Sequence, residues 1–317
     1  MGFGGIALAD TDGLVVRDNS IIDNGPDFLQ PICGIFVLRS EGFEISRNHI
    51  INNGARTDDE LTASAVKKGA RGGIYIVNAV TPAVPITILM GGTGESRELE
   101  TVPFSRGEPA AKIQENVVTV PLGRSLTIFA TGAVSVVGNQ FTSFGIQPLS
   151  LDDLVKMFKD AGGKLTAAIM MQLLDLLAGN VLIFDRGTPA WLPAQHASYT
   201  DVKTGNAANG ASWAAKTNNL DNVNTAGINA LKKFNRFFAN GTVLFTNNQC
   251  HQNLATSEQS FAISSIFIAS LDDIGFHNNQ CDCDMERDFL LTNALLFGMT
   301  ARVSDNRFRE SIARVLF

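Results

Sequence analysis

Two short segments concentrate the residues that could bind a metal ion. The first, NNQCHQN, contains Cys250 and His251, and the second, HNNQCDCD, contains Cys281, Asp282 and Cys283. Thiolates, imidazoles and carboxylates are the ligands that zinc takes in proteins. Aligning the two segments on their shared Asn-x-Cys spacing gives three pairs: Cys250 with Cys281, His251 with Asp282, and Gln252 with Cys283.

A different interpretation of these cysteines fits their positions better. Cys250 and Cys281 fall where other copies of a repeat, described below, carry Ile or Phe, and a cysteine packs there as a small apolar residue. The paired Cys-x-x-Cys spacing of structural zinc sites is absent. We therefore predict buried thiols, including Cys33, with no metal and no cofactor; a disulfide or a zinc site is the alternative.

Acid pairs are the other groups that could do chemistry. Glycoside hydrolysis uses two carboxylates, and the sequence contains Asp58-Asp59 and Asp272-Asp273. No third acid or histidine has a spacing that would place it beside either pair, and aspartates are also common in turns. The four histidines fall in turns or polar segments: His49, His196, His251 and His277. We predict no catalytic residue.

The elements that would position these residues come from a repeated pattern. It has two apolar-x-apolar segments separated by five residues, then two residues, an Asn, one residue and a further apolar residue. Five copies are complete or nearly so, and a sixth is partial: Ile6–Ile21, Ile35–Ile50, Leu126–Phe141, Ile266–Cys281, Leu295–Phe308 and Val243–Cys250. Alternation with period two indicates strands, and five residues are too few for a crossover helix.

Each copy is therefore predicted to be one turn of an all-β solenoid, in which equivalent strands pair about 4.8 Å apart. The Asn falls at one register, where stacked side-chain amides can hydrogen-bond as a ladder. The predicted ladder residues are Asn19, Asn48, Asn139, Asn248, Asn279 and Asn306. A β-sandwich with Asn-rich turns is the alternative, but it predicts hairpins and no fixed offset between strands.

Segments such as GIFVLRSEGFEISRNHIINNG resemble the repeats of right-handed parallel β-helix proteins of the pectin-lyase-like superfamily. SLDDIGFHNNQCDCD and LTNALLFGMTARVSDNRF are also similar to parts of large uncharacterised bacterial β-helix proteins. The resemblance implies a right-handed parallel β-helix. Many members of that superfamily cleave acidic polysaccharides, so it also implies a carbohydrate-active enzyme or glycan-binding protein as an alternative function.

The pattern is interrupted at three places within one predicted body, 1–317. We expect a long loop excursion over 81–123. We expect an inserted helical hairpin over 150–178, because a Ser-x-x-Asp capping pattern precedes apolar residues at helical spacing. The third insertion, over 188–240, is predicted to be a polar loop followed by a helix.

Composition limits the function classes. The chain has 317 residues and a formal net charge of −6, without a basic run, which argues against nucleic-acid or anionic-membrane partners. No segment has the length and hydropathy of a membrane span or the pattern of a signal peptide, so no compartment is predicted. Neither end shows the polar capping unit of a solenoid, which suggests a longer protein or an assembly.

One outward row of the first predicted strand is unusually apolar: Ala7, Phe36, Tyr75, Thr127 and Phe267. A strand that is apolar on both faces is normally covered on both. The cover is either the inserted helices or another chain, so Phe36, Tyr75 and Phe267 are a candidate partner face. The sequence thus favours a structural or binding module that associates with itself or with other protein subunits.

Overall fold

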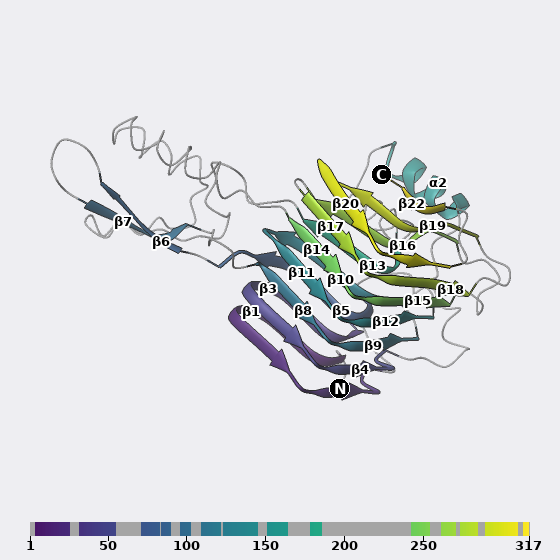
Figure 1. Ribbon diagram of the computed structural model, residues 1–317, viewed down its shortest axis with the longest axis horizontal. Coiled ribbons are helices and arrows are strands. Elements are labelled where there is room, and N and C mark those ends of the chain that lie inside the picture. Colours follow the sequence, from purple (N-terminus) through teal and green to yellow (C-terminus); the bar gives the residue numbers. More distant parts are fainter. Residues whose placement is uncertain are drawn as a thin grey trace.

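The alternating apolar residues form short parallel strands that pair with their equivalents in the next repeat. In the computed structural model, Ile6 lies opposite Ile35, Ile35 opposite Ile74, and Ile74 opposite Leu126. The strands of successive repeats form a stack (Figure 1). The predicted all-β parallel solenoid is confirmed. The structure describes residues 4–25, 32–54, 71–82, 84–89, 96–102, 109–121, 123–144, 151–163, 178–185, 242–253, 261–270, 273–284, 289–309 and 313–316.

Each coil contains three strand positions. The first position is occupied by β5 (Arg71–Val80), β10 (Arg124–Thr131), β13 (Ala178–Asp185), β16 (Phe261–Ser270), β19 (Phe289–Phe297) and β22 (Ala313–Leu316). In the first two coils, β1 (Gly4–Arg17) and β3 (Ile32–Ser46) run through both the first and second positions.

The second position continues with β8 (Ala111–Gln114), β11 (Val134–Val137), β14 (Val243–Thr246), β17 (Asp273–His277) and β20 (Thr300–Ser304). The third position contains β2 (Ser20–Ile22), β4 (His49–Ile51), β9 (Val117–Val120), β12 (Gln140–Ser143), β15 (Gln249–Asn253), β18 (Gln280–Asp284) and β21 (Arg307–Phe308). The first and second positions form one 13-stranded sheet and the third forms a 7-stranded sheet. The described strands therefore form seven coils, numbered 1 to 7 in chain order, and β22 is the first strand of an eighth.

Inward side chains from all three positions form one continuous core. Its central members, such as Ile45, Ile113 and Phe141, have no exposed surface. The rings of Phe245, Phe276 and Phe308 stack along the axis, with centroids 5.3 and 6.3 Å apart and ring planes within 5°. At the end coils the same inward positions are only partly buried: Ile6, Leu8 and Leu14 at one end, and Ala301, Val303 and Phe308 at the other.

The interruptions differ in part from the sequence-based prediction. The excursion predicted over 81–123 contains an antiparallel hairpin, β6 (Val84–Leu89) with β7 (Ser96–Val102), which projects from the stack in Figure 1. The prediction of a loop up to residue 123 was wrong, because β8 and β9 already belong to the coil. The hairpin separates them from β5 and so breaks the fixed offset on which the repeat was identified.

The helical prediction is only partly within the described residues. α2 (Leu151–Asp160) forms after β12, where the capping pattern placed the first helix of the 150–178 hairpin. The second predicted helix and the whole 188–240 insertion lie outside the described residues.

One inward residue was assigned to the wrong face. The fixed offset placed Leu295 inside the coil, but Ala294 and Leu296 point inward, opposite Ile266 and Ile268. The corner between β19 and β20 is one residue shorter than the corner between β16 and β17, so the alternation shifts by one position.

Candidate functional site: the asparagine ladder

The corner between the second and third strands is built from a two-residue unit. The first residue has a left-handed backbone and the second is an asparagine. In seven coils the first residue has φ between +53° and +70°: Asp18, Arg47, Glu115, Gly138, Asn247, Asn278 and Asp305. This conformation turns the chain sharply and places the asparagine side chain along the axis, toward the next coil.

The asparagines form a continuous hydrogen-bonded ladder. In each rung, the backbone N–H and the side-chain Nδ2 of one asparagine both donate to Oδ1 of the asparagine in the next coil. The N–H distances are 2.8 to 3.0 Å and the Nδ2 distances are 2.9 to 3.2 Å. The order of the rungs is Asn19, Asn48, Asn116, Asn139, Asn248, Asn279 and Asn306.

Each Nδ2 also donates to backbone carbonyls beside the turn. Asn48 Nδ2 donates to the carbonyls of Val16 and Ser46, at 2.9 and 3.0 Å. Asn139 repeats this with Ile113 and Val137, at 2.9 and 3.1 Å. The five middle rungs are fully buried or nearly so, and a buried amide is tolerated only when its donors and acceptor are paired. The ladder therefore pairs the polar side chains that these five turns bury.

Asn116 is a rung that the sequence-based pattern missed. Its local signal was present, because Ala111, Ile113, Asn116 and Val118 keep the second half of the repeat. The first half, at Ile74 and Ile76, lies far upstream because the β6–β7 hairpin intervenes. Asn116 accepts from Asn48 and donates to Asn139, so it connects the first two predicted rungs to the other four.

A second, shorter ladder lies at the corner after the third strand. The backbone N–H and Nδ2 of Asn24 donate to Asn53 Oδ1, at 3.1 and 3.0 Å. Asp23 and Asn52, which precede them, have φ of +54° and +55°. All non-glycine residues with positive φ in the described part of the chain thus directly precede a ladder asparagine. The recurrence of Asn five residues after Asn19 and Asn48 was the signal for this ladder in the sequence.

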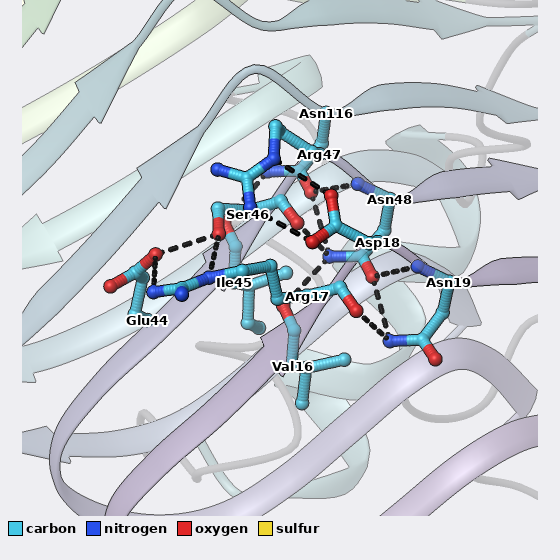
Figure 2. Close-up of polar contacts among 10 residues, drawn as sticks. All are labelled: Val16, Arg17, Asp18, Asn19, Glu44, Ile45, Ser46, Arg47, Asn48 and Asn116. Carbon is cyan, nitrogen blue, oxygen red and sulfur yellow. Dashed lines mark hydrogen bonds and ion pairs between the residues drawn. The ribbon is translucent and has the colours of Figure 1, made fainter.

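Ion pairs on the outer side of the turn join the first two rungs (Figure 2). Arg47 Nε and Nη2 donate to the two carboxylate oxygens of Asp18, at 2.7 and 2.8 Å. Arg17 Nη2 donates to Glu44 Oε1 at 2.8 Å, and Ser46 Oγ donates to the same oxygen at 2.7 Å. Both pairs connect coil 1 to coil 2, so they reinforce the ladder at its exposed end.

These contacts favour the charged forms of their members. The hydrogen bond from Arg47 holds the pKa of Asp18 below its ordinary value, and the same bond raises the pKa of Arg47. The Ser46 hydroxyl, followed by the Arg17 guanidinium, lowers the pKa of Glu44. Because these groups are solvent-exposed, each pair contributes little stability, and that contribution weakens in salt.

The candidate metal ligands align as their spacing predicts. Cys250 lies opposite Cys281, His251 opposite Asp282, and Gln252 opposite Cys283. All three cysteines are buried without a disulfide, as is Cys33. Burial raises the pKa of Cys250, with a contribution from the neighbouring Cys281 thiol, and burial likewise raises the pKa of Cys33. In the part of the chain that the structure describes, no three His, Cys, Asp or Glu residues are grouped closely enough to hold a metal ion.

Asp273 and His277, an acid and a histidine singled out above, both have partners on β20. Asp273 accepts a hydrogen bond from Thr300 at 2.7 Å and forms an ion pair with Arg302, and these contacts lower its pKa. His277 Nδ1 lies 3.0 Å from Ser304 Oγ. Asp58-Asp59, Asp272 and His196 lie outside the described residues.

The outward row of the first strand is largely covered. The register places Phe36 beside Tyr75, and Tyr75 beside Thr127. Tyr75 and Phe267 are 6% and 5% exposed in the single chain, whereas Phe36 is half-buried. Leu182 and Leu295 extend the row and form a second apolar cluster with Phe267. The chain itself therefore covers most of this face.

Comparisons with known proteins give no relative from which a function could be carried over. No protein-family model matches the chain, and searches of curated proteins and of solved structures found no significant match. Within the described residues, no helix is both long enough and apolar enough to span a membrane.

Proposed function

We propose that this chain is a structural module: a right-handed parallel β-helix of pectin-lyase-like type that assembles with a second copy of itself through the strands of coil 1. The observation that supports the proposal best is the edge formed by β1 and β2. β1 is 14 residues long, and among the described strands β1 pairs only with β3 and β2 only with β4. An edge of this length presents a row of backbone groups that another strand can pair with.

The right-handed sense rests on a general rule of chain connection. Parallel strands joined by a crossover within one sheet are right-handed in nearly all proteins, because of the twist of the strands. Each coil here returns the chain to a parallel strand of the same sheet, as in the connection from β10 to β13. We also propose that the segments inserted between the coils contain helices, as α2 does after β12.

The polarity of the ladders also leaves side-chain acceptors at coil 1. Within each ladder, Oδ1 accepts from the asparagine of the preceding coil, as Asn48 Oδ1 accepts from Asn19. Among the described residues no rung donates to Oδ1 of Asn19 or of Asn24. The inward residues Ile6, Leu8 and Leu14 of the same coil are only partly buried. Association at this edge therefore buries apolar surface and pairs backbone groups together.

The opposite end favours contact between two copies through their coil 1 edges. β22 pairs with β19 and occupies the first position of an eighth coil, while no described strand continues β20 or β21. That end is stepped, so coil 1 of a second copy cannot pair with β20 and β21 without displacing β22. Two coil 1 edges can meet without such a step, related by a two-fold axis.

A single substitution can block this edge without disturbing the coil. Asp18 N–H donates to the carbonyl of Ser46, and the Val16 carbonyl accepts from Asn48 Nδ2, so residues 16 and 18 face β3. The N–H of Val15 therefore points to the open edge, and its side chain is 55% exposed. Val15→Pro removes that donor, which proline can do in an edge strand. Val15→Thr keeps the donor and is the matched control.

Light scattering at micromolar concentration tests the proposal. We expect the native chain and Val15→Thr to be dimers or larger, and Val15→Pro to be monomeric with an unchanged circular dichroism spectrum. A monomeric native chain contradicts assembly through this edge. So does a Val15→Pro variant that assembles as the native chain does.

A further inference from the structure

Each coil has a corner where its third strand leads to the first strand of the next coil. The residue type at the start of the first strand differs between the first three coils and the next three. In the first three coils this corner contains the glycine row Gly5, Gly34 and Gly73. A Cβ on Gly34 would lie 2.2 Å from a methyl group of Ile50, and one on Gly73 would lie 2.2 Å from a methyl group of Val118. This row therefore faces the third strand inside the coil, where the branched side chains leave no space for another side chain.

In the next three coils the same row carries polar residues: Ser125, Asn180 and Ser265. Asn180 lies within a register shift of β13. Its Nδ2 donates to the carbonyls of Phe141 and His251, at 3.1 and 3.0 Å, and both belong to third strands. The polar row thus faces inward as the glycine row does.

Gln252 brings a further polar group to this corner. It lies on β15 opposite Ser143 of β12, and its side chain has no exposed surface. A Cβ added to Gly179 would lie 1.8 Å from Gln252 Nε2, so the amide is seated directly against the irregular segment of β13. The absence of a side chain at Gly179 is what makes room for this amide.

Five polar atoms at this corner have no hydrogen-bond partner among the described residues: Ser125 Oγ, Asn180 Oδ1, Gln252 Nε2, Gln252 Oε1 and Ser265 Oγ. The four residues are at most 1% exposed. Buried polar groups in folded proteins are nearly always paired, because leaving one unpaired costs free energy. The set includes a donor-only group, acceptor-only groups and hydroxyls, and a water molecule can pair with all three kinds.

We infer that this corner is a binding site for buried, ordered water, with Gln252 and Asn180 as its main ligands and the two serines as further partners. Buried waters typically make about three hydrogen bonds to groups that otherwise lack partners. Water at this site pairs the polar groups at the corner of coils 4 to 6. The Asn24–Asn53 hydrogen bonds pair the polar groups at the same corner of coils 1 and 2. The alternative is direct pairing of the Gln252 amide with another protein group.

A crystal structure at high resolution distinguishes these two arrangements. We expect water within about 2.7–3.2 Å of Gln252 Nε2 or Oε1 and of Asn180 Oδ1. A Gln252 amide bonded directly to protein atoms, with no water at the corner, overturns the inference.

Magnetic relaxation dispersion of water ¹⁷O provides the test in solution, because it detects water held inside a protein. We expect the native chain to show a dispersion that Gln252→Leu reduces. Gln249→Leu, on the exposed side of the same strand, should leave it unchanged. Equal dispersions for the native chain and Gln252→Leu contradict the site. If Gln252→Leu does not fold, the crystal structure of the native chain still decides the question.

Discussion

The residue before each ladder asparagine has to adopt a backbone conformation that L-amino acids normally avoid. Left-handed φ brings Cβ close to the following carbonyl oxygen, and only glycine escapes this cost. Yet six of the seven positions in the long ladder carry Asp, Asn, Arg or Glu rather than glycine. Asp and Asn tolerate the conformation best, whereas Arg47 and Glu115 adopt it because the rungs on either side fix the turn.

Glu115 tests this explanation. Glu115→Ile should lower the free energy of unfolding by about 1–2 kcal/mol, because a β-branched side chain fits the left-handed region poorly. Glu115→Gly should not lower it. Gln114→Ile, one residue earlier in the extended backbone of β8, is the control and should be tolerated. Denaturation in urea measures all three, and equal losses for the two isoleucine variants would contradict the account.

Charge reinforces the ladder between coils 1 and 2. The folded chain lowers the pKa of Asp18 through its hydrogen bond from Arg47, so the unfolded chain binds a proton more readily. The stabilisation by this pair is therefore complete above the ordinary pKa of an aspartate and is lost as the pH falls through the lower folded value.

Comparison of the native chain with Asp18→Asn measures this effect. The melting temperature of the native chain should be the higher one at pH 7, and the difference should shrink as the pH falls below the ordinary pKa of an aspartate and then through the lower folded value. Asparagine also adopts left-handed φ readily, so the substitution removes charge without straining the turn. Added salt should reduce the difference at pH 7. A difference that is independent of pH would argue against the ion pair.

At the scale of elements, β15 and β18 show how the third strand adjusts to its neighbours. Both place a cysteine where β4 has Ile50, and both lie in coils whose inner corner carries a polar side chain instead of glycine. At this inward position both thiols are buried, so they pack as small apolar residues.

The four thiols should accordingly be inert in the folded chain. Burial raises the pKa of Cys250 and Cys33, and a thiol that stays protonated and covered reacts slowly. We expect almost no reaction with a disulfide reagent in buffer and four equivalents in denaturant. Gln249→Cys, on the exposed side of β15, should add one thiol that reacts at once. Rapid reaction of the native thiols in buffer would contradict their burial.

The sequence predicted those elements whose strands and ladder residue keep a fixed offset. It failed where the offset changes: at Asn116, separated from its first strand by a hairpin, and at Leu295, where the corner is one residue shorter. Coverage of Tyr75 and Phe267 could not be derived either, because it depends on which distant segments pack against the first strand. The short Asn24–Asn53 ladder was predictable from its spacing but spans only two coils.

At the scale of the whole molecule, the ladder and the core join coils that the chain connects only through long excursions. Asn139 and Asn248 are 109 residues apart in sequence, yet the N–H and Nδ2 of Asn139 both lie 3.0 Å from Asn248 Oδ1. The same rung is linked to Asn116 on its other side. Asn139 is therefore the rung through which the first four coils are hydrogen-bonded to the last three at this corner.

Replacing this rung tests most directly the central claim that one buried ladder holds the solenoid together. Asn139→Ala removes the partners of buried amide and carbonyl groups in both neighbouring coils, so the free energy of unfolding in urea should fall by about 1–3 kcal/mol. Gln140→Ala, at the adjacent exposed position, should change it by less than about 0.5 kcal/mol. Equal stabilities of the two variants would contradict the claim that the ladder is a main support of this fold.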